Sequence, residues 1–181
     1  MPRLFVALPV PPESADRLLE FRTSLPGVRW LTPQSLHLTL RFLGKVDSAS
    51  LPEIDEALHE IRQPPVPVQC VGLDMYQGAD RRPRAIVRAV ENQVNLAGLH
   101  RAVEQALRAF DSTGRRRFKP HVTLARINRS ARRSRLQYCL DGAGMLEPVT
   151  WLAEGFSLYS SHLGREGAVY TAEATYPLRV R

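Results

Sequence analysis

Apolar residues alternate with polar ones, or form short apolar runs, in seven segments of strand length. These segments are residues 3–8, 37–43, 66–73, 84–90, 121–127, 154–159 and 168–176. Proline or glycine follows some of them, as Pro9 and Gly44 do, and both residue types interrupt strands. The pattern therefore predicts many short strands joined by turns.

Apolar residues recur every three or four positions in other segments, which is the pattern of amphipathic helices. The predicted helices cover residues 13–24, 50–61, 92–110 and, as a short element, 131–140. Ser50 and Glu53 have the spacing of a capping box and mark the start of the second helix. Helices and strands are mixed along the chain, and several connections are short enough for hairpins. This arrangement predicts an α+β fold with antiparallel sheet.

One short motif occurs twice, each time at the start of a predicted strand. Residues 37–40 read His-Leu-Thr-Leu, and residues 121–124 read His-Val-Thr-Leu. The second copy begins 84 residues after the first, which is nearly half of the chain, and a predicted helix follows each copy. The repetition predicts a single domain over residues 1–181, built from two similar lobes with an internal repeat.

The motif places chemically useful groups on one face of each strand. Alternate strand residues share a face, so His37 and Thr39 point one way while the leucines point the other. The same argument applies to His121 and Thr123. If the strands face each other across a groove, one neutral imidazole can take a proton from water and one imidazolium can protonate a leaving oxygen. The hydroxyls can hold phosphate oxygens, so the set suits phosphodiester hydrolysis.

Composition agrees with a phosphate-bearing ligand. The formal net charge is +7, and all the basic residues except Lys45 and Lys119 are arginines. Arginine binds phosphate through a planar, bidentate fork. A solvated arginine-rich surface would explain the same composition, but eight of the arginines lie between residues 115 and 135, close to the second motif.

Other features of the sequence restrict the setting of the reaction. The two cysteines, Cys70 and Cys139, form no paired or metal-binding motif, so we expect a reducing, cytoplasmic environment. No apolar stretch approaches the ~20 residues that span a bilayer. A His-x-Thr strand is a poor ligand pair, and neither motif contains Asp or Glu. We therefore expect no metal and no cofactor.

With their flanking residues, the two motifs resemble those of the two-histidine phosphoesterase superfamily. The resemblance is specifically to the RNA 2′,3′-cyclic phosphodiesterases, historically called 2′-5′ RNA ligases, and it covers nearly the whole chain. It is carried by residues 3–7 (RLFVA), Trp30, Pro33, residues 36–44 (LHLTLRFLG), residues 118–126 (FKPHVTLAR), residues 158–161 (LYSS) and Tyr170.

The resemblance implies a two-lobed fold, with an antiparallel-rich sheet in each lobe, helices outside and a central cleft lined by the motifs. It implies that His37 is the proton donor and His121 the proton acceptor, an order that the residues alone leave open. The implied reaction is metal-free hydrolysis of a 2′,3′-cyclic phosphate RNA end to a 2′-phosphate, with weak reverse 2′-5′ ligation. We expect a monomer that needs neither a membrane nor a protein partner.

The arginine that binds the phosphate is open on sequence grounds. Strict alternation puts Arg41 on the His37 face and turns Arg126 away from His121, unless the strand bulges. The resemblance nevertheless ranks Arg126 above Arg41 as a substrate ligand. Phe42 could stack on a base, but alternation groups it with Leu38, so packing in the core is the favoured interpretation.

Two other functions fit the same motifs. One is a phosphodiesterase that acts on 2′-5′ oligonucleotides or on a cyclic nucleotide-sugar phosphate, since the same four groups would serve. The other is a non-catalytic module that binds RNA ends, against which the presence of both histidines and both threonines counts.

Overall fold

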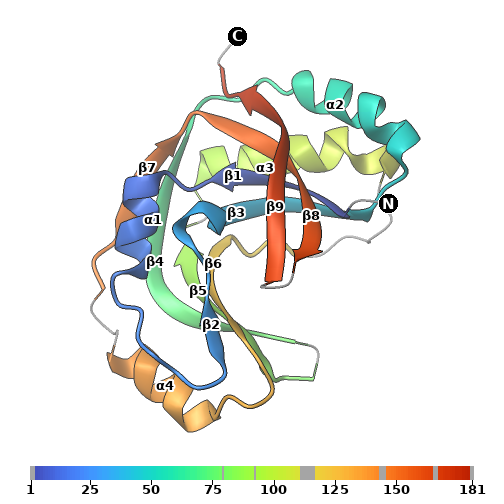
Figure 1. The fold of residues 1–181 in the computed structure, drawn as a ribbon. Coiled ribbons are helices and arrows are strands. Elements are labelled where there is room, and N and C mark those ends of the chain that lie inside the picture. Colours follow the sequence, from blue (N-terminus) through green and yellow to red (C-terminus); the bar gives the residue numbers. More distant parts are fainter. Residues whose placement is uncertain are drawn as a thin grey trace.

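A computed structural model describes residues 3–78, 80–91, 93–110, 117–142, 146–164 and 167–179. These residues form an α+β fold, in which one large antiparallel sheet is surrounded by helices (Figure 1). The predicted fold class is thus confirmed. In the described part of the chain, no helix is long and apolar enough to cross a membrane, and both cysteines are free thiols.

The sheet contains nine strands within the described residues. They are β1 (Arg3–Pro9), β2 (Val28–Trp30), β3 (His37–Lys45), β4 (Val66–Gln77), β5 (Pro83–Val90), β6 (His121–Ile127), β7 (Val149–Ala153), β8 (Gly155–Gly164) and β9 (Gly167–Pro177). All seven predicted strands form, some of them longer than predicted. The sequence did not predict β2 and β7, which are too short for alternation to be recognised.

The four predicted helices also form. They are α1 (Pro12–Leu19), α2 (Leu51–His59), α3 (Val94–Ala106) and α4 (Arg133–Gly142). The predicted capping box is wrong, because the Ser50 side chain makes no capping hydrogen bond. A short 3₁₀ turn over Ser48–Ser50 precedes α2 instead, and Asp47 caps it by accepting from the Ala49 N–H at 3.2 Å.

The two motif strands lie side by side at the centre of the sheet. Its strand order is β7-β4-β5-β6-β3-β1-β8-β9, with β2 paired to the free length of β6. One antiparallel pair, Leu38 with Val122, joins β3 to β6. Each half of the sheet therefore contributes one motif strand, and the motifs meet where the halves join.

The aliphatic face of each motif strand forms the core, as alternation predicts. Leu38, Leu40, Val122 and Leu124 are each at most 3% exposed and belong to one buried cluster. Helix α3 covers this face by packing on β3 and β4. Helix α4 covers the far end of the sheet, where Leu136 packs in a second cluster of β5 and β6 residues. The opposite face of β3 and β6 is left for the polar groups.

Candidate active site

The strand register brings the four polar residues of the motifs together. Because Leu38 pairs with Val122 in an antiparallel ladder, His37 lies across from Thr123, and Thr39 lies across from His121. All four side chains are partly buried. Each histidine thus faces the threonine of the other strand on the face opposite the core, as the motif spacing predicts.

A backbone carbonyl fixes the tautomer of each imidazole. Nδ1 of His37 lies 2.8 Å from the carbonyl oxygen of Ser35, and Nδ1 of His121 lies 2.7 Å from that of Lys119. A carbonyl oxygen only accepts, so both Nδ1 atoms carry a hydrogen and donate it. The ring nitrogen left for proton transfer is therefore Nε2 in both histidines, and the same local geometry serves both.

A bulge in β6 turns Arg126 toward the histidines. Two consecutive residues of β5 pair with Thr123 and Ala125 of β6. Leu124, between them, is therefore an extra residue in β6. Alternation restarts after the bulge, so Ala125 is buried and Arg126 is exposed. Arg126 also lies near enough to His37 to lower the pKa of that ring. The bulge removes the conflict between alternation and the predicted role of Arg126.

Strand β3 contains the same bulge, which corrects the placement of two predicted residues. Two consecutive residues of β1 pair with Thr39 and Arg41 of β3, so Leu40 is the extra residue. Phe42 is consequently 58% exposed, so the interpretation as a core residue was wrong. Phe42 and Arg126 each stand five positions after the histidine of their strand. They occupy matching places on the polar faces of β3 and β6.

Arg41 is turned toward helix α3 by this bulge. It is 8% exposed and forms an ion pair with Glu104 of α3. Nε2 of His100 lies 3.8 Å from the same carboxylate, and burial lowers the pKa of His100. The Arg41 charge is therefore compensated by protein, whereas strict alternation had placed Arg41 beside His37 as a rival phosphate ligand.

Aromatic rings surround His37. The ring centroid of His37 is 4.8 Å from that of Phe5, 5.0 Å from that of Tyr170 and 6.2 Å from that of Tyr159. This burial lowers the pKa of His37 to about 4, and the charge of Arg126, together with that of His121 whenever it is protonated, acts in the same direction. The Ser35 carbonyl opposes them, because it favours the protonated ring. In the free protein His37 is accordingly neutral at pH 7.

His121 stands in a different environment, beside a mixed aromatic and basic cavity. Its ring stacks on Tyr76 of β4 at a centroid distance of 5.4 Å. The cavity has a volume of about 280 Å³. It is lined by Thr39, Leu40, Arg41, Phe42, Tyr76, His100, Glu104, Arg117, Phe118, Lys119 and His121. Aromatic rings, cations and one polar motif residue from each strand, Thr39 and His121, therefore share this space.

Sequence reasoning missed several of these lining residues. Tyr76 lies near the end of a long strand, and nothing local connects it with a histidine 45 positions later. His100 was interpreted as an ordinary helix residue, but its ring stacks on Phe118 at 3.9 Å and borders the cavity. The pairing of distant strands brings both residues to the site.

The donor set around the motifs does not suit a metal ion. In the described part of the chain, no three His, Cys, Asp or Glu side chains lie close enough to bind one.

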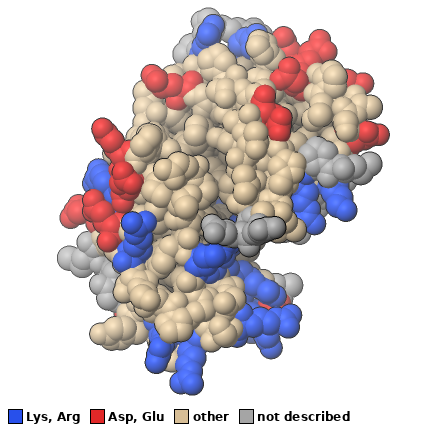
Figure 2. Space-filling model, viewed as in Figure 1, with Lys and Arg blue, Asp and Glu red and all other residues tan. Residues whose placement is uncertain are grey.

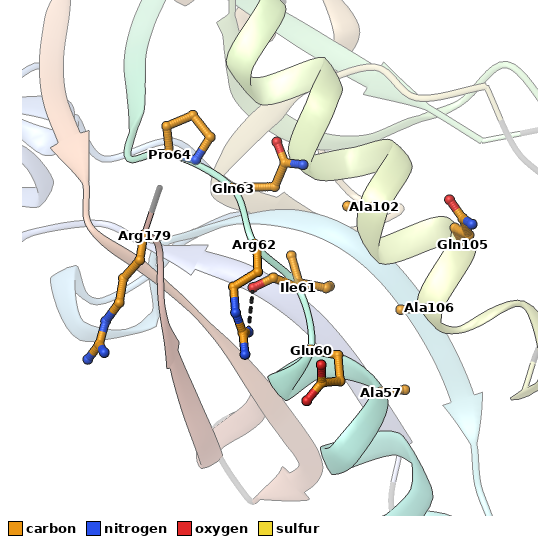
Figure 3. Close-up of a pocket in the computed structure, with 10 residues that line it drawn as sticks. All are labelled: Ala57, Glu60, Ile61, Arg62, Gln63, Pro64, Ala102, Gln105, Ala106 and Arg179. Carbon is orange, nitrogen blue, oxygen red and sulfur yellow. Dashed lines mark hydrogen bonds between the residues drawn. The ribbon is translucent and has the colours of Figure 1, made fainter. Parts of the chain in front are cut away.

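A second groove, of about 760 Å³, lies between α2 and α3 and is lined by small and polar residues (Figure 3). It contains none of the predicted site residues. Arg62 there donates to the Ile61 carbonyl at 3.2 Å.

Comparisons with known proteins agree with this arrangement. The family described as LigT like Phosphoesterase matches residues 8–87 and 89–170. An RNA 2′,3′-cyclic phosphodiesterase of Thermus thermophilus is 35% identical over 188 aligned positions, which cover 98% of this chain and 90% of the relative. The enzyme of the same name from Aeropyrum pernix is 32% identical over 162 positions, covering 85% and 90%.

Solved structures show the same fold. A protein of Thermus thermophilus superposes with a TM-score of 0.81 at 27% identity, covering 99% of both chains. Escherichia coli LigT in complex with 3′-AMP gives a TM-score of 0.75 at 25% identity, covering 98% of this chain and 99% of that one. The chain therefore belongs to the LigT-like phosphoesterase family.

Proposed function

We propose that this chain is an RNA 2′,3′-cyclic phosphodiesterase that opens the cyclic phosphate of an RNA end to a 2′-phosphate. One observation carries the proposal: two imidazoles with the same fixed tautomer lie on adjacent strands, each across from the other strand's threonine. Two further facts support it. The relatives above are RNA 2′,3′-cyclic phosphodiesterases, and LigT has been solved with a nucleoside monophosphate.

The reaction needs two proton transfers on opposite sides of the phosphorus. One imidazole accepts a proton from water through Nε2 while the water oxygen bonds to phosphorus. The bond from phosphorus to O3′ breaks, and the second imidazole gives O3′ its proton. The products are a 2′-phosphomonoester and a free 3′-hydroxyl. Thr39 and Thr123 hold the non-bridging oxygens, and Arg126 neutralises the charge that builds up on them.

His37 is the proton donor in this proposal, and His121 is the acceptor. The order follows the family resemblance and sets a condition on His37. Its ring is neutral in the free protein because burial lowers its pKa to about 4. An anionic phosphate beside the ring favours the protonated form. His37 therefore takes up its proton as the substrate binds, and His121, which borders the cavity of about 280 Å³, takes the proton from water.

The two halves of the fold are proposed to be an internal repeat within one domain. Both central strands begin with the histidine motif, both bulge three positions after the histidine, and both expose the residue five positions after it. The family match also falls in two successive segments of similar length. A monomer is proposed because one chain supplies both histidines, and a cytoplasmic setting because both thiols are free.

Product analysis tests this function. A short RNA ending in a 2′,3′-cyclic phosphate is incubated with the protein in excess EDTA, and ³¹P NMR follows the phosphorus. We expect complete conversion to the 2′-phosphate. Formation of a 3′-phosphate would contradict the assigned leaving group. Loss of activity in EDTA, with recovery on adding a divalent ion, would contradict the metal-free mechanism. Tight binding without turnover would instead identify an RNA-end binding module.

A further inference from the structure

Arginines gather on one part of the molecule beyond the histidine site. Figure 2 shows Lys and Arg over the lower part of this face, around α4 and the β4–β5 hairpin, whereas Asp and Glu gather mainly above and to the left. Five arginines line one cavity of about 400 Å³ between that hairpin and the turn that follows β6. We call this group the arginine face; it comprises Arg81, Arg82, Arg84, Arg129 and Arg133.

The arginine face keeps a large positive charge. Its acidic neighbour is Asp80, which pairs with Arg84 at 2.8 Å and lies 4.0 Å from Arg82. Five guanidinium groups and one carboxylate leave about four net positive charges around one cavity. All five arginine side chains are exposed. Like charges held together on a surface repel one another, so an anionic ligand would lower the energy of the group.

Hydrogen bonds hold both turns that carry these arginines, since the β4–β5 turn contains backbone bonds between Gly78 and Arg82 and between Arg81 and Gly78. In the turn after β6, the Asn128 side chain accepts from both the N–H and the hydroxyl of Ser130, at 3.0 and 2.6 Å. Gly27 packs so closely on this turn that a Cβ would lie 2.6 Å from the backbone nitrogen of Ala131. The five arginines therefore extend from hydrogen-bonded turns of the fold.

Strand β6 connects the arginine face to the histidine site. His121 begins the strand, Arg126 lies near its end, and Ile127 lines the arginine cavity. Six steps of ~3.3 Å place Ile127 about 20 Å from His121. Arg126, which is exposed, lies between His121 and Ile127 along the strand. A linear polyanion whose end occupies the histidine site can thus follow positive charge along β6.

We propose that the arginine face binds the phosphodiester backbone of the RNA chain that precedes the cyclic end. An RNA oligonucleotide is then a better substrate than a cyclic mononucleotide, which cannot reach the arginine face. This inference rests on the proposed function. Arginine forks suit phosphate oxygens, and the lining residues described for this cavity include no aromatic ring for stacking on a base. Contacts of this kind position RNA without reading its sequence.

The test uses a triple variant and a matched control. Arg81→Asn, Arg129→Gln and Arg133→Gln remove three charges and leave the pair between Asp80 and Arg84 intact. Asparagine suits position 81, where φ is 58°, because it tolerates the left-handed region. The control variant, with glutamine at three exposed arginines elsewhere, changes the net charge equally. Its positions are Arg17, Arg101 and Arg108.

Each variant is assayed on an octanucleotide with a cyclic end and on adenosine 2′,3′-cyclic phosphate. We expect the arginine-face variant to lose at least about tenfold in kcat/KM on the octanucleotide and nothing on the mononucleotide. Three lost phosphate contacts should also flatten the slope of log kcat/KM against log salt by about 2. The control variant should behave as the wild type does on both substrates.

Other results would overturn the inference. Equal losses in the arginine-face and control variants would show that only net charge matters. Unchanged octanucleotide kinetics would show that RNA does not reach the arginine face. Binding keeps the test independent of the proposed function: fluorescence anisotropy measures the affinity for an octanucleotide that already carries a 2′-phosphate. If the wild type binds it no more tightly than the arginine-face variant does, the inference fails, whether or not the wild type has catalytic activity.

Discussion

The proton balance of substrate binding tests the role of His37. Burial among aromatic rings lowers its pKa to about 4. At pH 6 only about 1% of these rings are protonated in the free protein. A proton donor must carry its proton when the substrate is bound. If His37 is the donor, each binding event at this pH therefore takes up about one proton from solution.

The energetic cost of this uptake can be worked from the same pKa. Protonating a group two pH units above its pKa costs about 2.7 kcal/mol, and each further pH unit adds about 1.4 kcal/mol. Binding should consequently weaken about tenfold for each unit of pH above 5, until the pH exceeds the pKa of His37 in the complex. A neutral His37 would give no such slope.

Calorimetry measures both quantities on an inactive variant. We expect His121→Ala to bind adenosine 2′,3′-cyclic phosphate with turnover too slow to disturb a titration, and this ligand keeps a single negative charge over the whole pH range. Titrations at pH 6 in buffers of different ionisation enthalpy give the number of protons taken up, which should be about one. Adding His37→Asn should abolish the uptake. Adding His100→Asn should preserve it, although His100 borders the cavity beside His121 and burial also lowers its pKa.

The opposite result would reverse the assigned order of the histidines. If no proton is taken up and the affinity is constant between pH 5 and 7, His37 stays neutral in the complex. His37 would then be the acceptor that activates water, and His121 would be the donor. Uptake that disappears with His100→Asn would trace the proton to His100 and would equally contradict the reasoning about His37.

Four further variants test the geometry and the electrostatics of the site. Arg126→Ala should cost about 1.5–3 kcal/mol in phosphate binding with little change in Tm. Arg41→Ala should instead remove about 3 kcal/mol of stability, because it leaves Glu104 without its ion pair. Equal effects of the two variants on binding would contradict the assignment of Arg126 to the substrate by the bulge. Phe42→Ala should weaken nucleotide binding by about 1–3 kcal/mol in titrations and leave Tm unchanged, because the ring is exposed, and a large fall in Tm would restore it to the core. Because the pKa of His37 falls from 6.5 to about 4 on folding, the unfolded chain binds more protons between these values, so stability should fall by up to about 3 kcal/mol as pH drops from 7.5 to 4; urea unfolding should show this loss in the wild type and not in His37→Asn.

Strand alternation predicted the shared face of the histidines and threonines but failed beyond the motifs. His37 and Thr39 share a face because only one residue separates them, and the same spacing holds in the second copy. One extra residue at Leu40 or Leu124 then reverses the pattern, which exposes Phe42 and Arg126 and buries Arg41. A bulge depends on the neighbouring strand, so the sequence of one strand does not reveal it.

Residues far apart in the chain were the hardest to predict. Tyr76 reaches His121 through the pairing of β4 with β5 and of β5 with β6, and Phe5 reaches His37 through the pairing of β1 with β3. No local spacing encodes these contacts. They matter for the chemistry, because the rings beside His37 change its pKa while its motif is nearly identical to that of His121.

Turnover of the two histidine variants is the most direct test of the central claim. On a cyclic-ended RNA, His37→Ala and His121→Ala should each reduce kcat by about 10² to 10⁴ fold, since each removes one proton transfer. The double variant should be little slower than either single one, because both groups act in one step. His59→Ala, at an exposed position on α2, should match the wild type. Near-wild-type turnover in either active-site variant, or loss of activity only together with a large fall in Tm, would contradict the account.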